Sequence, residues 1–241
     1  MLKLSEADDS DRAYSTLNER ELFVFDLEQI LKVLTFKEVC LLVFPCLEIF
    51  AVEQEYLKIE LFKQLPHVFK KVMQSKARVN GELLSEEQLL DILTVNLFPL
   101  ISQLLMISDE SVQNEGIKAL VTVCQDKILN LDDTVFLVHN VLQILFKKAS
   151  VSENSKVGAL LLLEAFVKED FFGKEMVDHF MAENLQMCLH DTTFKVKRPL
   201  MQCLITISKH LSKEQINGYV FSMFKTLSQP SELWGMRRVC V

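Results

Sequence analysis

The stretch Asp191-Thr192-Thr193-Phe194-Lys195-Val196-Lys197 decides the fold, because it joins two apolar-periodic runs through a polar turn and the arrangement recurs. In each occurrence one amphipathic helix ends at the turn, and a second helix opens on a branched apolar residue. The other occurrences are Glu53-Gln54-Glu55-Tyr56-Leu57-Lys58, Asp109-Glu110-Ser111-Val112, Ser155-Lys156-Val157 and Glu232-Leu233-Trp234-Gly235-Met236-Arg237. Taking Leu57, Val112, Val157, Val196 and Met236 as equivalent gives spacings of 55, 45, 39 and 40 residues. These spacings lie at or above the period of helical-hairpin repeats and predict an all-α chain built as an α-solenoid.

The composition agrees with this prediction. Hydrophobic residues make up 49% of the chain, while 6 Gly and 5 Pro leave few of the turn residues that many short strands need. The net charge of -7 argues against nucleic acid, because phosphate-binding surfaces concentrate uncompensated Lys and Arg. The most apolar run, residues 40–50, is too short to cross a bilayer and contains Pro45 and Glu48, so we expect no membrane contact.

The cysteines indicate a reducing compartment. They lack any Cys-x-x-Cys pair and mostly sit among apolar residues, so we expect reduced core thiols. They are Cys40, Cys46, Cys124, Cys188, Cys203 and Cys240. The N-terminal residues are acidic instead of basic and apolar, which is not typical of a secretory signal. We therefore expect a soluble protein of the cytoplasm, the nucleus or both.

The chain divides into a tail and one array. Residues 1–18 are acidic and aperiodic, which predicts a disordered tail. Residues 19–241 are predicted to form one array of about four complete repeats and a truncated fifth, because residues 236–241 begin a second helix and then stop. Two early helices are expected to split near Thr35, and a helix ending near Phe50 is expected to pair with one from about Gln54 to Val72.

Helix-start signals agree with the repeat positions. Ser85 with Gln88 and Ser212 with Gln215 have the spacing of a capping box, in which two side chains satisfy free backbone donors. The segment Ser150-Val151-Ser152-Glu153 has a similar form. Asp109 and Asp191 are expected to cap the second helices that follow them.

Two further patterns mark the helices of each repeat. Phe44-Pro45 and Phe98-Pro99 stand 12 and 13 residues ahead of Leu57 and Val112, which predicts bent first helices. Second helices carry a core stripe, seen most clearly at Val196, Leu200, Cys203, Leu204 and Ile207.

Signals of catalysis are weak. The five histidines show no metal-ligand spacing, and the best pair, His190-Asp191, is more typical of a structural turn. Gly-rich phosphate loops and Gly-x-Ser-x-Gly elbows are missing from the sequence. We expect no enzyme, no metal and no cofactor.

The bent first helix, the acidic turn, the apolar-then-basic start of the second helix and the period near 40 together resemble the HEAT repeat. Within that class, residues 36–241 resemble the regulatory subunit 1 family of serine/threonine-protein phosphatase 4 and, more distantly, the phosphatase 2A scaffold subunits. The segments that carry the resemblance are Glu60-Leu61-Phe62-Lys63-Gln64-Leu65-Pro66-His67, Phe98-Pro99-Leu100, Phe194-Lys195-Val196-Lys197-Arg198 and Trp234-Gly235-Met236-Arg237-Arg238-Val239-Cys240. The resemblance implies a scaffold that holds a phosphatase 4 or 2A type catalytic subunit and presents phosphoprotein substrates to it.

The chain also departs from the HEAT pattern, in which Arg or Lys follows the apolar residue and pairs with a neighbouring turn aspartate. Lys58, Lys197 and Arg237 match this pattern, whereas Gln113 and Gly158 do not. Pro199 falls early in a second helix, where the family prefers a small or apolar residue.

Binding of a partner is expected at the turns within repeats and on the second helices. The candidate partner-binding residues are Glu53, Glu55, Asp109, Glu110, Asp191, Lys195, Lys197, Arg198, Trp234 and Arg237. Each has a structural alternative: the tryptophan packs between hairpins, and the charged residues form a solvated face. The competing functions are a HEAT nuclear transport receptor that wraps cargo or a small GTPase, and a cytoskeletal or chromatin adaptor.

Overall fold

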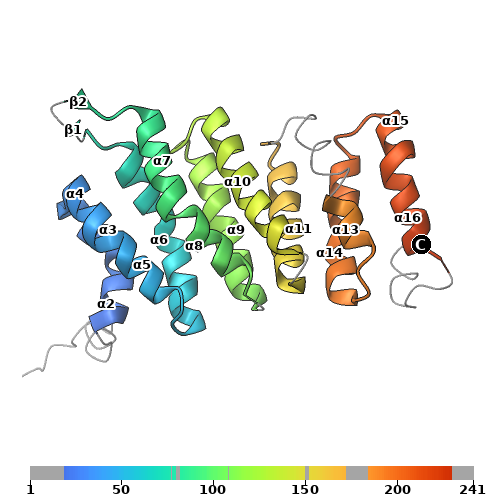
Figure 1. The fold of residues 1–241 in the computed structure, drawn as a ribbon, viewed down its shortest axis with the longest axis horizontal. Coiled ribbons are helices and arrows are strands. Elements are labelled where there is room, and N and C mark those ends of the chain that lie inside the picture. The colour runs from blue at the N-terminus through green and yellow to red at the C-terminus, as the bar shows by residue number, and fades with distance from the viewer. Residues whose placement is uncertain are drawn as a thin grey trace, which may run out of the picture.

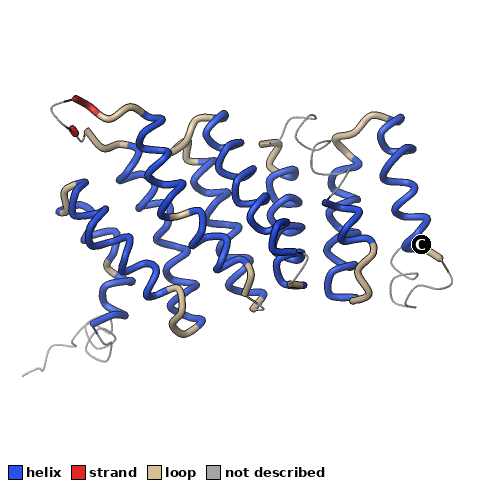
Figure 2. The backbone as a smooth tube through the Cα atoms, viewed as in Figure 1, coloured by secondary structure: helices blue, strands red, loops and turns tan. Residues whose placement is uncertain are grey.

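The structure, a computed structural model, describes residues 19–76, 78–79, 82–107, 109–149, 152–171 and 184–229. Across these residues the chain is almost entirely helical, and its helices follow one another in chain order along the long axis (Figure 1). The strands within them are Arg78–Val79 (β1) and Glu82–Leu83 (β2), which pair antiparallel (Figure 2). The predicted all-α class is confirmed. This strand pair was not predicted, and the predicted tail, residues 1–18, lies outside the described residues.

The helix boundaries fit the predicted pattern closely. The predicted split near Thr35 falls between α3 and α4, and the helix expected from about Gln54 is α6. The helical elements are α2 (Glu19–Phe25), α3 (Leu27–Val33), α4 (Phe36–Glu38), the π-helical η1 (Val39–Val43), α5 (Phe44–Phe50), α6 (Glu55–Met73), α7 (Glu86–Asn96), α8 (Phe98–Leu105), α9 (Glu110–Gln125), α10 (Leu131–Ala149), α11 (Glu153–Lys168), α13 (Gln186–Leu189), α14 (Phe194–Ser208), α15 (Lys213–Gln215), the π-helical η3 (Ile216–Val220) and α16 (Phe221–Leu227).

The helices pack in two layers. The second helices, α6, α9, α11 and α14, each contact the next in chain order, and α2 and α3 contact α6. In the other layer α8 contacts α10, and α13 contacts α16. The first helices α5, α8, α10 and α13 also contact the second helix that follows each of them. The turns between α5 and α6, between α8 and α9 and between α13 and α14 lie along one edge of the molecule, the lower edge in Figure 1.

The core comes from the apolar positions that define the repeat. Leu57, Val112, Val157 and Val196 are all buried, and Met236 lies outside the described residues. The predicted stripe of α14 is fully buried at every position from Val196 to Ile207 that belongs to it. Removing each such side chain from water contributes about 1.5–3 kcal/mol, so the repeat positions hold the layers together.

Capping boxes begin several helices, as predicted. In the pairs Ser85–Gln88 and Ser212–Gln215, the serine hydroxyl accepts from the glutamine N–H and the glutamine side chain accepts from the serine N–H. A third box, which begins at Thr35, starts α4 and was not predicted. These reciprocal bonds satisfy backbone donors that the first turn leaves free.

Two of the other predicted caps need correction. Asp109 caps α9 as predicted, because its Oδ1 accepts from the Val112 N–H at 2.9 Å. The box predicted in the segment Ser150-Val151-Ser152-Glu153 would start at its first serine. The cap of α11 is instead Ser152, whose hydroxyl accepts a hydrogen bond from the Ser155 N–H. Asp191 is not a cap: Thr193 occupies that position before α14, because Asp191 lies too far from the helix start.

Two first helices contain prolines, but only Pro99 follows a break: at Pro45 the helix continues from η1 into α5 with helical backbone at Val43 and Phe44. Pro99 lies in the first turn of α8, directly after the break that ends α7, and Pro45 lies in the first turn of α5, after η1. A proline lacks the N–H that would continue the preceding helical ladder. Without a proline, α10 runs for 19 residues. Pro66 and Pro199 nevertheless lie inside α6 and α14, so the second helices continue through theirs.

One described segment, Glu86–Leu105, is long and apolar enough to cross a membrane by length and composition. More than half of its most apolar window, 56%, is buried inside the protein. Core helices of soluble proteins commonly have this property, so the segment carries no argument for a membrane.

Candidate functional site

Three of the predicted site residues come together in one groove. Glu110 on α9 and Lys195 and Arg198 on α14 line a groove of about 240 Å³ that crosses α11. The remaining lining residues are Gln113, Val157, Leu161, Phe194, Pro199 and Gln202. The groove therefore collects side chains from three consecutive second helices, as expected for a surface built by helices stacked side by side.

The floor of the groove depends on how closely α11 approaches α8. An ideal Cβ at Gly158 would stand 2.5 Å from the Leu105 carbonyl oxygen, so only glycine fits there. The same oxygen accepts a hydrogen bond from Nε2 of buried Gln113 at 2.9 Å. Gln113 and Gly158 are two of the three departures from the HEAT pattern, and both lie against the end of α8. They position Val157 and Leu161, whose apolar side chains line the groove.

The two walls of the groove carry opposite charges. Lys195 Nζ donates to Asn154 Oδ1 at 2.7 Å, which holds the ammonium group near the start of α11. Arg198 is exposed, and no described residue accepts a hydrogen bond from its guanidinium. Glu110 is exposed on the α9 wall. The apolar floor formed by Val157 and Leu161 therefore lies between walls of opposite charge.

Asp191 has a structural role beside the groove. It forms an ion pair with Lys156 of α11 at 2.6 Å, with side chains that are 7% and 15% exposed. Its Oδ1 also accepts from the Thr193 N–H at 2.8 Å and the Thr193 hydroxyl at 2.7 Å. Burial alone would raise the pKa of Asp191, but the bonds from Lys156 and Thr193 outweigh it and lower the pKa. Asp191 therefore ties α11 to the turn before α14.

Lys197 does not lie on the surface with its neighbours. Its residue is 5% exposed, whereas Lys195 and Arg198 are exposed. The interpretation of these three residues as one solvated basic cluster is therefore wrong for Lys197. The reason is helical geometry, because Lys197 lies three and four residues before the buried Leu200 and Met201 and therefore shares their face of α14.

The acidic residues of the first predicted turn lie elsewhere, at the contact between α2 and α6. Glu53 accepts a hydrogen bond from Arg20, and the Tyr56 hydroxyl donates to Glu21. Glu55 is exposed at the start of α6. This cluster joins α2 to the start of α6 and does not line the groove.

The remaining predicted site residues are Asp109, Trp234 and Arg237. Asp109 is engaged as the cap of α9. Trp234 and Arg237 lie outside the described residues, so their predicted roles as partner contacts stay predictions.

No three His, Cys, Asp or Glu side chains of the described residues lie close enough together to hold a metal ion. The described cysteines are free thiols. Burial raises the pKa of Cys124 and of Cys188 to about 12, and it raises the pKa of Cys203 well above its ordinary value. Such thiols stay protonated at neutral pH and are poor nucleophiles.

Sequence reasoning missed Phe194 and Leu161 as groove residues and Lys156 as the partner of Asp191. Phe194 is 40% exposed although it opens a helix beside buried Val196, which is a usable signal of a surface anchor. Lys156 lies 35 residues from Asp191, and no local pattern connects them.

No protein-family model matches the chain, and no curated protein matches it in sequence.

Proposed function

We propose that this chain is a HEAT-type α-solenoid that acts as a non-catalytic scaffold or regulatory subunit of a serine/threonine protein phosphatase of the phosphatase 4 type. The observation that carries the binding role is the groove shared by α9, α11 and α14, with Glu110 on one wall and Lys195 and Arg198 on the other. The resemblance of the quoted segments to phosphatase 4 regulatory subunits supports the choice of partner.

The solenoid interpretation is supported by the order of contacts. Each second helix contacts the second helices of neighbouring hairpins, and the first helices form the other layer. In repeat arrays this arrangement yields an extended surface that grows with each unit. Such a surface suits a large protein partner better than a small substrate.

The proposed mechanism is positional. A scaffold that binds a catalytic subunit and a phosphoprotein together raises the local concentration of the substrate at an active site on the other chain. The scaffold itself then needs no catalytic residue. The proposed setting is the cytoplasm, the nucleus or both, where these phosphatases and their substrates would meet the chain.

The test is quantitative mass spectrometry of proteins recovered with the tagged chain. The groove variant combines Lys195→Glu with Arg198→Glu, and the matched control combines Lys209→Glu with Lys213→Glu, which are exposed and lie outside the groove. We expect a phosphatase 4 or 2A catalytic subunit with the unchanged chain and the control, and a loss of at least tenfold with the groove variant.

Three outcomes separate the alternatives. Absence of any phosphatase from the unchanged chain contradicts the proposed function. Recovery of transport factors in its place favours the transport receptor. Equal recovery of a phosphatase with both variants would support the phosphatase as the partner. It would contradict the groove as the site that the phosphatase contacts.

A further inference from the structure

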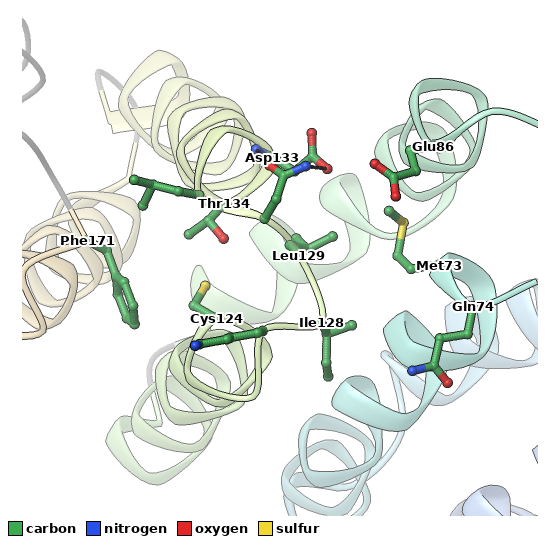
Figure 3. A pocket seen from close by; sticks show the side chains of 12 residues that line it. Met73, Gln74, Glu86, Cys124, Ile128, Leu129, Asp133, Thr134 and Phe171 are labelled. Atoms are coloured by element: carbon green, nitrogen blue, oxygen red, sulfur yellow. Dashed lines mark hydrogen bonds between the residues drawn. The ribbon is translucent and has the colours of Figure 1, made fainter.

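A cavity lies at the edge of the molecule opposite the hairpin turns. It measures about 660 Å³ and lies between the end of α6, the start of α7, the connection from α9 to α10, and Phe171 after α11 (Figure 3). Ligand-binding cavities in proteins typically measure roughly 300–1,000 Å³. The cavity is therefore large enough for a few side chains of a partner, and it shares no lining residue with the groove.

The floor of the cavity is largely apolar. Leu129 and Cys124 are buried, and Met73, Ile128 and Phe171 are partly exposed toward the space they line. The Phe171 ring is held against Phe166 of α11 with their centroids 5.5 Å apart. A floor of this kind favours an apolar group of a ligand, because the group leaves water on binding.

The rim of the cavity is acidic. Glu86 at the start of α7 and Asp133 at the start of α10 face each other on the same side of the cavity (Figure 3). Asp133 is fixed in place: its Oδ2 accepts from Asn130 Nδ2 at 2.9 Å, and its N–H donates to Asn130 Oδ1 at 2.8 Å. Burial, and then the charges of Glu86 and Asp132, raise the pKa of Asp133. The two carboxylates therefore repel each other, and a cation between them would relieve that repulsion.

The lining residues also indicate which kind of cation fits. Lys127 is the one basic side chain among the lining residues, all of which the structure describes, and it forms no ion pair with Glu86 or Asp133, so the two carboxylates leave the lining with a net negative charge. No group of three His, Cys, Asp or Glu side chains in the described residues suits a metal ion. An apolar floor beneath two carboxylates instead suits an organic cation attached to an apolar group.

We propose that this cavity binds a short segment of a partner protein in which a lysine or arginine lies next to an apolar residue. The cationic group lies between Glu86 and Asp133, and the apolar side chain lies on Met73, Ile128 and Leu129. A protein segment supplies both groups at side-chain spacing. This site is separate from the groove, and the inference does not depend on the phosphatase assignment.

The experiment follows methyl resonances of the full chain labelled with ¹³C at Met and Ile. The probe is an acetylated, amidated pentapeptide of alternating leucine and lysine, and its comparison peptide has glutamine in place of lysine. We expect the Met73 and Ile128 methyl signals to shift on titration with the lysine peptide and to stay unchanged with the glutamine peptide. Glu86→Gln combined with Asp133→Asn should weaken binding of the lysine peptide about tenfold, because both charges that face the cation are lost.

The matched control is Glu87→Gln, which removes a charge one residue away on α7 that does not line the cavity. Its affinity for the lysine peptide should equal that of the unchanged chain. Three results would overturn the inference: no shift at Met73 and Ile128, equal binding of the two peptides, or equal weakening by both variants. Binding of n-butylamine alone as tightly as the peptide would also overturn it, because the site would then recognise a small amine.

Discussion

The Leu105 carbonyl oxygen at the end of α8 illustrates how single residues determine the packing of this chain. A helix end leaves its last carbonyl groups without partners inside the helix. Here Gln113 donates to this oxygen at 2.9 Å, and Gly158 allows α11 to approach it. Two of the three residues that depart from the HEAT pattern, Gln113 and Gly158, therefore contact one backbone atom.

Gly158→Ala should destabilise the protein by about 1–3 kcal/mol, because the new Cβ would meet the Leu105 carbonyl oxygen, a backbone atom that cannot rotate away. The matched control is Gly218→Ala in η3, where a Cβ would meet nothing within 4 Å. That change should stabilise the protein by up to about 1 kcal/mol, because alanine loses less freedom in a helix. Urea unfolding followed by circular dichroism measures both, and equal effects would refute the close approach at Gly158.

Asp191→Asn should lower the free energy of unfolding by about 2–3 kcal/mol at pH 7, because it leaves the partly buried Lys156 without its partner charge. The folded state lowers the pKa of Asp191, so its contribution is complete above its ordinary value of 3.8 and is lost as pH falls through the lower folded-state pKa. The difference between the two proteins should therefore shrink below pH 3.8. Urea unfolding at a series of pH values measures this.

The control for Asp191 is Lys195→Met, which removes an exposed contact between the same two elements. This change should alter stability by less than about 0.5 kcal/mol. A difference for Asp191→Asn that does not depend on pH would show that the ion pair contributes nothing to stability.

Residues whose contacts lie within a few sequence positions were easier to predict than residues whose contacts lie in another hairpin. The serine caps at Ser85 and Ser212 and the apolar starts of the second helices follow from patterns within a few positions. The pairing of Lys156 with Asp191 depends on how neighbouring hairpins pack. Sequence spacing alone contains no information about that packing.

At the scale of elements, two adjacent residues at the start of α9 have different positions: Asp109 caps the helix, and Glu110 lines the groove. Asp109→Ala should cost about 1 kcal/mol of stability, because it removes the cap of α9. Glu110→Ala should change stability by less than about 0.5 kcal/mol. It should weaken binding of the partner proposed for the groove. Thermal unfolding and partner recovery, measured on both variants, test this division. Loss of the partner by Asp109→Ala without loss of stability would contradict it.

The interruptions of the first helices show what a sequence pattern reveals about an element. Pro99 marks the break between α7 and α8, because proline removes a donor from the helical ladder, whereas the helix continues through Pro45. The π-helical turn η3 has no proline, and only its structure reveals it. The β1–β2 pair was likewise hidden, since two-residue strands are too short to show alternation.

At the scale of the whole molecule, the proposed solenoid predicts that damage stays local. Leu200→Ala in the core of α14 should cost about 2–4 kcal/mol and lower hydrogen-exchange protection in α14 and α11, while α6 keeps its protection. The control Ile205→Ala alters an exposed position of the same helix and should leave all protection unchanged. Uniform loss of protection across α6, α11 and α14 would contradict nearest-neighbour packing.

The two candidate sites lie at opposite edges of the helical layers and are lined by different residues. The two proposals together predict that one partner binds in the groove and a second at the cavity without competition between them. Simultaneous binding is what a positional mechanism requires.

The measurement that tests the central claim most directly is sedimentation of the purified chain with a purified phosphatase 4 catalytic subunit. We predict a stable complex that forms with the unchanged chain and with the Lys209→Glu, Lys213→Glu control, and that is lost with Lys195→Glu, Arg198→Glu. Failure of the unchanged, folded chain to co-sediment with the catalytic subunit would contradict the proposed scaffold role.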